Sequence, residues 1–202
     1  MAETNQPLPP AAVLVRSRVA DFDTWLAAFE SHEDVRRAAG ILGHHINRAE
    51  DDPNDVSLYM ALSDLDKARG FATSEDLRTR MQAAGVISVP ELIYLTPVRE
   101  AIVWDRELPA FMLSHSVADF DRWLEGYDEA GDLQKAHGIV GQAANRSIDD
   151  PALAIVYHQA ESFDTLRAFL DNEQLKAKMQ EAGVTSVPEV QFVTGGWAKR
   201  YG

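Results

Sequence analysis

The chain repeats itself with a period of 98 residues. Three pairs of blocks show the repeat: "VADFDTWL" from Val19 with "VADFDRWL" from Val117, "NRAEDDP" from Asn47 with "NRSIDDP" from Asn145, and "AGVISVPE" from Ala84 with "AGVTSVPE" from Ala182. All three pairs keep one register without a gap. A period of this length fits a whole small domain better than a solenoid repeat. We therefore expect a duplicated unit whose ancestor was a homodimer.

The first half of each unit predicts a strand followed by a helix. Residues 12–19 are short and rich in β-branched side chains, which is typical of a strand. Asp21 is a plausible N-cap, and Gly40 stands where the helix should stop. Between them one apolar helix face is formed at the spacing i, i+3, i+4 and i+7 by Phe22, Trp25, Leu26 and Phe29.

The second half of the unit predicts two strands, a helix and a last strand. Strands at about 41–48 and 56–62 flank a turn at Asp51–Pro53. A helical region covers about 65–84, with Ser74 as a possible cap for a new turn. The last strand, about 89–95, starts near Pro90, and proline indicates a peripheral strand.

This order is the ferredoxin-like split βαβ arrangement, which leaves one sheet face bare. We therefore predict an α+β chain of two tandem ferredoxin-like βαββαβ repeats that form an intramolecular pseudo-dimeric α+β barrel. The expected parts are a flexible N-terminus (1–10), the first repeat (11–96), a linker (97–108), the second repeat (109–194) and a tail (195–202). The apolar "AIVW" in the linker could add a strand. In the tail, Trp197 could cover a pocket mouth, or the tail could fray.

Both repeats resemble members of the dimeric α+β barrel superfamily. The features are the "DFDxW" helix start, the "NR…DDP" hairpin, Phe71 with "LRTRMQAAGV", and the closing "SVPE". The resemblance is to antibiotic-biosynthesis-monooxygenase-like and stress-responsive proteins, and it implies the fold over residues 11–96 and 109–194. It carries no catalytic signature that can be transferred residue by residue.

Composition excludes several classes of function. The net charge of −13 argues against nucleic-acid and anionic-membrane partners. The absence of cysteine excludes disulfides and thiolate chemistry. No apolar stretch approaches a membrane span, and residues 1–12 do not resemble a secretory signal. A cytoplasmic protein without a cofactor or metal is the default expectation.

Two histidines differ between the halves at buried strand positions. His115 aligns with Ser17 and His158 with Met60, and each alternates with apolar neighbours on its strand. In the predicted strand order they could line one pocket, in the second repeat only. There they would act as a general base or proton relay, or each would merely satisfy a hydrogen bond in the core, which is the commoner case.

Other polar candidates point to binding or to packing. His44 and His45 should face opposite sides of a strand, one exposed and one packed, so they cannot both bind one ligand, and no third metal ligand is evident. Three polar residues of the first half recur at the matching positions of the second half and are candidates for ligand binding. The pairs are Asn47 and Asn145, Arg48 and Arg146, and Tyr59 and Tyr157. The arginines could hold a carboxylate, an enolate or a phenolate, or could fix the hairpin. The tyrosines could offer hydroxyls to a ligand, or fill the sheet interface.

Three functions remain open from the sequence, which does not decide whether the chain is an enzyme. The first is a protein that binds a small apolar or aromatic molecule without catalysis. The second is a cofactor-independent monooxygenase or cyclase acting on an aromatic or polyketide-like compound. The third is a structural, self-assembling module. Because duplication completes the expected dimer, a monomer or weak homodimer is predicted.

Overall fold

The computed structural model describes residues 7–201, which form two matching sets of four strands and four helices. The first set is β1 (Ala11–Arg18), α1 (Phe22–Ser31), α2 (Glu33–Ala38), β2 (Ile41–Ala49), β3 (Asp55–Leu62), α3 (Leu65–Ala72), α4 (Glu75–Ala83) and β4 (Glu91–Ala101). The second set is β5 (Leu108–Ser116), α5 (Phe120–Glu129), α6 (Gly131–Ala136), β6 (Ile139–Ser147), β7 (Leu153–Ala160), α7 (Phe163–Leu170), α8 (Glu173–Glu181) and β8 (Glu189–Arg200). The predicted α+β class with two ferredoxin-like repeats is confirmed. Within 7–201, no helix is long and apolar enough to cross a membrane.

The chain divides into two compact units. The first-repeat unit consists of Pro9–Leu95 with residues 195–201, and the second-repeat unit of Thr96–Thr194 with residues 7–8. Strand β4 passes from the first unit to the second after Leu95, and β8 passes the other way after Thr194. Each unit therefore contains the end of the other repeat's last strand.

Both last strands are longer than the sequence suggested. Residues 97–101, expected as linker, belong to β4, whereas residues 102–104 lie outside any strand. Residues 195–200, expected as tail, belong to β8. There the ring of Trp197 packs edge-on against Phe22, with centroids 4.9 Å apart. Of the N-terminal segment expected to be flexible, residues 1–6 lie outside the described residues.

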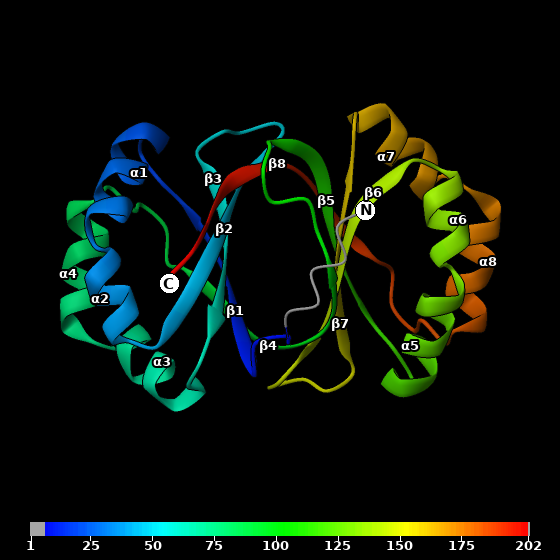
Figure 1. Cartoon of the computed structure of the whole chain (residues 1–202), viewed down its shortest axis with the longest axis horizontal. Coiled ribbons are helices and arrows are strands. Elements are labelled where there is room, and N and C mark those ends of the chain that lie inside the picture. Colours follow the sequence, from blue (N-terminus) through cyan, green and yellow to red (C-terminus); the bar gives the residue numbers. More distant parts are fainter. Residues whose placement is uncertain (1–6, 202) are drawn as a thin grey trace. The chain divides into compact units, whose positions relative to one another are not determined.

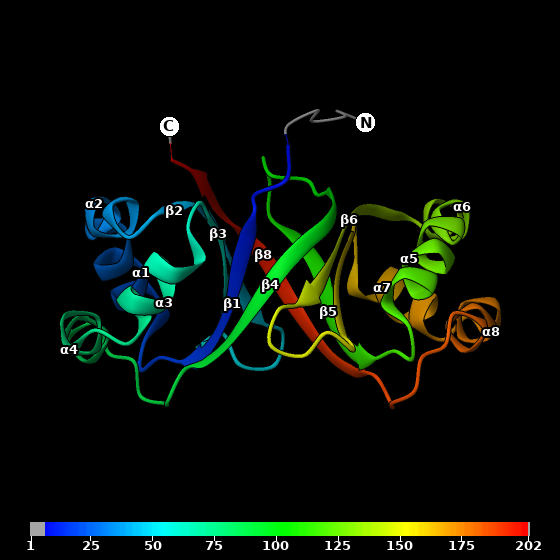
Figure 2. The same cartoon turned by 90° about the horizontal axis from the view of Figure 1, so that it is seen from below.

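Each sheet has the ferredoxin-like strand order. In the first-repeat unit the order is β4-β1-β3-β2, with the end of β8 beside β2. Helices α1 to α4 lie on one face of this sheet (Figure 1). In the second-repeat unit the order is β8-β5-β7-β6, with the end of β4 beside β6, and α5 to α8 lie on one face (Figure 2). That the two bare faces pack against each other stays a prediction.

Helix boundaries follow local capping signals with one difference from expectation. Asp21 caps α1 by accepting a hydrogen bond from the Thr24 amide (2.8 Å), and Ser74 caps α4. Gly40 ends the helical region with a φ of 82°, as predicted from its position. However, the single helix expected from residue 22 to Gly40 is two helices that break at His32.

A glycine allows the end of β8 to lie close to β2. A Cβ atom at Gly43 would stand 2.7 Å from the backbone oxygen of Lys199, closer than real contacts permit. The amide of Tyr201 also donates to the carbonyl of Leu42 (2.8 Å). The position of Tyr201 in the first-repeat unit thus depends on Gly43 having no side chain.

Gly43→Ala should destabilise the protein by about 1–3 kcal/mol, because the methyl group must displace the backbone of β8. Urea unfolding followed by circular dichroism measures this. Gly70→Ala is the matched control, since nothing lies within 4 Å of a Cβ at this position in α3. That control should gain up to about 1 kcal/mol from helix propensity. Equal stability changes in the two variants would contradict the proposed close approach.

Candidate functional site

The first-repeat unit has a cavity of about 840 Å³ between its helices and its sheet, and the cavity is partly open to solvent. The sheet wall is formed by alternate residues of β1 and β3, among them Val13, Val15, Leu58 and Met60. Alternate residues of a strand point to the same face of the sheet, so these side chains all face the helices. The volume lies within the range of 300–1,000 Å³ that is usual for small-molecule sites.

The helix wall of this cavity is built from small and aromatic side chains. Helix α1 contributes Trp25 and Phe29, while α3 contributes Ala68, Phe71 and Ala72. Alanines at two positions of α3 leave space that larger side chains would occupy. The cavity is thus mainly apolar, with polar groups only at a few places on its wall and mouth.

The second-repeat unit has the matching cavity, but it holds only about 50 Å³. Every residue that lines it stands 98 positions after a residue that lines the first cavity. The two cavities are therefore the same site in two copies of one fold. One copy is open and the other is nearly filled.

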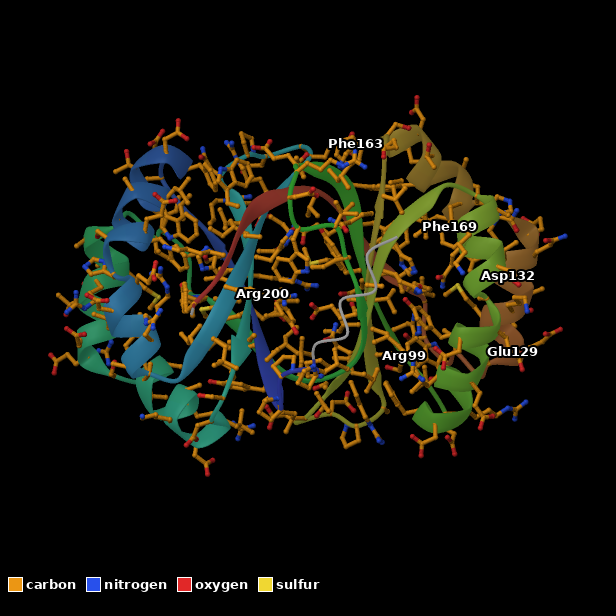
Figure 3. All side chains as sticks on the ribbon, in the orientation of Figure 1. Arg99, Glu129, Asp132, Phe163, Phe169 and Arg200 are labelled. Atoms are coloured by element: carbon orange, nitrogen blue, oxygen red, sulfur yellow. The ribbon has the colours of Figure 1, made fainter. Side chains whose placement is uncertain are left out.

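Larger side chains in the second repeat account for the difference. The pairs, first repeat before second, are Val13 and Phe111, Val15 and Leu113, Ser17 and His115, Ala68 and Leu166, and Ala72 and Leu170. Leu166 and Phe111 are fully buried, at 0% and 1% exposure. Phe169, labelled in Figure 3, packs with them in the same core cluster. The volume that is free in the first repeat is filled by hydrocarbon in the second.

The structure places His115 and His158 on the same small cavity. Both are 4% exposed. Both ring nitrogens of His115 and the Nδ1 of His158 are buried without a hydrogen-bond partner among the described residues. Burial lowers the pKa of His115 to about 4 and that of His158 to about 3. Both rings are thus neutral at pH 7 in a space with room for little more than water.

One weak network reaches His158. The hydroxyl of Tyr127 lies 3.1 Å from the amide oxygen of Gln142, to which it donates. The Nε2 of His158 lies 3.4 Å from the same hydroxyl. Because the hydroxyl hydrogen is used on Gln142, Nε2 is the donor and Nδ1 carries the free lone pair. A base is present here, but a substrate has no space beside it.

In the first repeat a different histidine lines the open cavity. His32 stands at the break between α1 and α2, and its Nδ1 lies 2.7 Å from the carbonyl oxygen of Ala28. A carbonyl oxygen only accepts, so Nδ1 carries the hydrogen, and in the neutral form of the ring Nε2 is the nitrogen with the lone pair. The matching residue of the second repeat is Ala130. Sequence comparison missed His32 because it lies in a helical region that was expected to be continuous.

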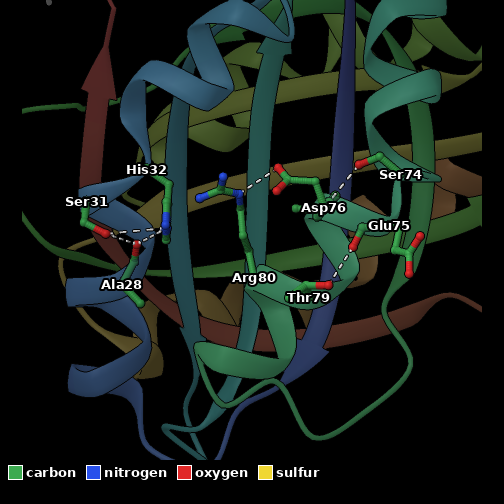
Figure 4. Close-up of polar contacts among 9 residues, drawn as sticks. Ala28, Ser31, His32, Ser74, Glu75, Asp76, Thr79 and Arg80 are labelled. Atoms are coloured by element: carbon green, nitrogen blue, oxygen red, sulfur yellow. Dashed lines mark hydrogen bonds and ion pairs between the residues drawn. The ribbon is translucent and has the colours of Figure 1, made fainter.

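Across the cavity from His32, helix α4 presents a paired arginine. The Nε of Arg80 donates to Asp76 at 2.7 Å, one turn earlier on the same helix. Figure 4 shows His32 and Arg80 on the two helical segments that flank the cavity, with Arg80 turned toward Asp76. The hydrogen bond from Arg80 lowers the pKa of Asp76, so this carboxylate stays ionised.

A second arginine of the cavity wall, Arg36, is buried at 5% exposure. Its guanidinium carbon lies 3.7 Å from the centre of the Phe29 ring. The matching residue is Gln134. Arg36 was not among the residues singled out from the sequence, although it differs between the halves in the same way as the two histidines.

The hairpin arginines lie outside both cavities. The Nε of Arg48 donates to the carbonyl of Pro53 (2.9 Å), and that of Arg146 donates to the carbonyl of Pro151 (2.9 Å). The Arg48 guanidinium also lies over the ring of Phe22, 3.9 Å from its centre. These contacts favour the hairpin role over ligand binding.

The remaining candidates also line neither cavity. Asn47 and Asn145 are buried, and Asn145 donates to the carbonyl of Ile155 at 3.4 Å. Tyr157 is buried, which raises the pKa of its hydroxyl, and Tyr59 is half-buried. Ligand binding by these four residues stays a prediction.

The expectation that one of His44 and His45 is exposed is wrong: both are buried, and burial lowers the pKa of each to about 4. The Nδ1 of His44 lies 2.7 Å from the hydroxyl of Tyr201. Among residues 7–201, no three His, Asp or Glu side chains are grouped so that they could hold a metal ion.

Comparison with known proteins adds information about the fold. No protein-family model matches the sequence, and no curated protein matches it either. A solved structure assigned as a monooxygenase from Lactobacillus acidophilus is similar with a TM-score of 0.66 and 13% identity, over 95% of this chain and 96% of that one. An anthrone oxidase-like protein is similar with a TM-score of 0.67 and 13% identity, over 94% and 92%.

A third solved structure comes from Listeria monocytogenes. It is an uncharacterised ferredoxin-fold protein related to antibiotic biosynthesis monooxygenases, with a TM-score of 0.55 and 7% identity, over 92% of this chain and 94% of that one. All three similarities extend across both repeats. The chain shares the ferredoxin-like α+β fold of these structures. At these identities the similarity shows the fold alone, so the activity of this chain has to be argued from its own residues.

Acid should destabilise this protein partly through His158. Its pKa is about 3 when folded and 6.5 in the unfolded chain, so only the unfolded state binds a proton as the pH falls from 6.5 toward 3. His158→Met, which introduces the residue of the first repeat, should reduce the stability lost between pH 7 and pH 5 by on the order of 1–2 kcal/mol.

Urea unfolding at the two pH values measures this difference. Phe111→Leu is the control, because it alters the same cavity without removing a titratable group. It should lose as much stability on acidification as the parent protein. An unchanged loss in His158→Met would show that this ring is not held neutral by burial.

Proposed function

We propose that this protein binds a small, mainly apolar molecule in the cavity of its first repeat. The observation that carries the proposal is the contrast between the two copies of one site, about 840 Å³ against about 50 Å³. The second copy shows that the fold can fill this space with ordinary side chains. An open cavity in the first copy is therefore not imposed by the fold.

The lining favours an aromatic or otherwise flat apolar ligand. The rings of Trp25 and Phe29 are stacked, with centroids 5.2 Å apart and an interplanar angle of 24°. Together with Phe71 they give one side of the cavity an aromatic surface. Val13, Val15 and Leu58 give the opposite side an aliphatic surface. Such a site suits a molecule of one to three fused rings.

Filling the cavity should abolish binding. The double variant Ala68→Leu/Ala72→Leu installs the residues of the second repeat on α3, and it should weaken binding of the neutral probe N-phenyl-1-naphthylamine by at least about tenfold. Probe fluorescence during titration measures the dissociation constant. Unchanged binding in this variant, or no binding to the parent protein, would contradict the proposal.

The control is Ala83→Leu on α4. Ala83 is exposed and does not line the cavity, so the same chemical change should leave probe binding unaltered. Circular dichroism of all three proteins would confirm that they are folded alike.

A cofactor-independent oxygenase or cyclase is the second candidate, and His32 favours it. Its Nε2 lone pair belongs to a side chain of the open cavity and is positioned by the Ala28 carbonyl. A base at this place could take a proton from an activated C–H group, such as the methylene of an anthrone. The carbanion would then reduce dioxygen: one oxygen atom enters the product as a carbonyl and the other leaves as water.

Turnover of anthrone under air tests this candidate. His32→Ala, which introduces the matching residue Ala130 of the second repeat, should lower oxygen uptake by about 100-fold or more while the neutral probe still binds. His137→Ala is the control, because His137 lies at the end of α6 and lines neither cavity. If the parent protein takes up oxygen no faster than buffer alone, the oxygenase candidate is wrong and only the binding function remains.

The proposed binder is a cytoplasmic monomer or weak homodimer. Duplication supplies both copies of the unit within one chain. The acidic composition disfavours nucleic-acid partners. A purely structural, self-assembling module is the less favoured alternative, since packing alone gives no reason for an open cavity in one repeat.

A further inference from the structure

The first-repeat cavity has a buried cation in its wall. Arg36 lies on α2, is 5% exposed and is one of the residues that line the cavity. A buried guanidinium normally stands beside a carboxylate, because a charge without a partner is costly to remove from water. None of the ion pairs found among residues 7–201 includes Arg36.

The partners that Arg36 does have are neutral. Its Nε donates to the hydroxyl of Tyr201 (2.6 Å), and its Nη1 donates to the carbonyl of Phe29 at the end of α1. The ring of Phe29 supports the guanidinium face. These contacts fix the orientation of the guanidinium, but none of them is with a carboxylate.

The carboxylate of Glu33 stands three residues before Arg36, and the charge of Arg36 contributes to lowering its pKa, but its ion pairs are with other residues. Glu33 forms an ion pair with Lys199 and lies 3.9 Å from the Nη1 of Arg37. The other charged pair of the cavity wall, Arg80 with Asp76, is already neutral as a pair. Arg78 also lines the cavity but is exposed to solvent, so Arg36 is the buried positive charge of a lining that includes no Asp or Glu among the described residues.

This arrangement occurs only in the repeat that has the open cavity. The residue that matches Arg36 is Gln134, and the residue that matches Tyr201 is Val103. The cation, the hydroxyl that holds it and the free volume are three separate differences between the halves, and they coincide in one unit. A purely structural arginine that caps α1 gives no reason for this coincidence.

We propose that Arg36 is the anion anchor of the cavity, and that the ligand is an apolar molecule with one carboxylate or similar anionic group. This inference rests on the proposed binding function and names the class of its ligand. The remaining nitrogen of the guanidinium would donate to the anion, while the apolar body would lie between the aromatic and aliphatic walls. Tyr201 is a positioning residue that holds the guanidinium in the cavity wall.

A pair of fluorescent probes tests the charge preference directly. 1-Anilinonaphthalene-8-sulfonate and N-phenyl-1-naphthylamine share one apolar skeleton and differ by the sulfonate. The parent protein should bind the anionic probe more tightly. Arg36→Gln introduces the residue of the second repeat. It should raise the dissociation constant of the anionic probe by about tenfold or more and change that of the neutral probe by less than about threefold.

Two further variants separate charge from geometry. Arg36→Lys keeps the charge and should retain part of the preference for the anionic probe. Tyr201→Phe removes the hydroxyl that orients the guanidinium. It should lower the affinity for the anionic probe by about two- to fivefold and leave the affinity for the neutral probe unchanged. Arg36→Lys that binds no better than Arg36→Gln would indicate that charge is not what the site supplies.

The outcomes distinguish this inference from the binding function itself. If Arg36→Gln weakens both probes equally, or neither, then Arg36 is structural and the anion anchor is wrong, although the cavity still binds. If the parent protein binds neither probe, or if Ala68→Leu/Ala72→Leu binds both as the parent does, then the cavity is not the site and both proposals are wrong.

Discussion

The volume of a few side chains between the helices and the sheet decides what each repeat can do. Both repeats have the same strand order and the same caps, so their backbones define equivalent sites. At the matched positions the second repeat has leucine where α3 of the first has alanine, and phenylalanine where β1 has valine. Close packing is the rule in protein interiors. The second repeat follows this rule and has a core of high density, whereas the first leaves a cavity large enough for a ligand.

The chemistry of the open site depends on the break between two short helices. Helix α1 ends at Ser31 and α2 begins at Glu33, and both His32, at the break, and Arg36, on α2, line the cavity. One supplies a lone pair and the other a positive charge. The last strand of the second repeat contributes as well. The end of β8 belongs to the first-repeat unit, and Tyr201, which follows it, places its hydroxyl against Arg36. Gly43 permits this approach. The site therefore combines a helix break, a strand end and missing side-chain volume.

Most of the fold could be predicted from the sequence, because it depends on local patterns repeated twice. The period of 98 residues, the apolar helix face from Phe22 and the turns at glycines all correspond to observed elements. The extension of β4 and β8 could not be predicted, since their ends pair only in the folded protein. The site was harder still. Comparing the halves by residue chemistry drew attention to His115 and His158, which do share a cavity. A cavity, however, is formed by small residues such as Ala68 and Ala72, whose significance appears only when several elements are brought together.

The difference between the two copies of the site can be measured in one experiment. Trp25 lines the open cavity and Trp123 the filled one, and both have indole N–H groups that give separate signals in a proton–nitrogen correlation spectrum. Trp25→Phe and Trp123→Phe assign the two signals. During titration with N-phenyl-1-naphthylamine, the Trp25 signal should shift and saturate, while the Trp123 signal stays in place. Equal shifts of both signals, or a shift of Trp123 alone, would contradict the conclusion that only the first repeat is open to a ligand.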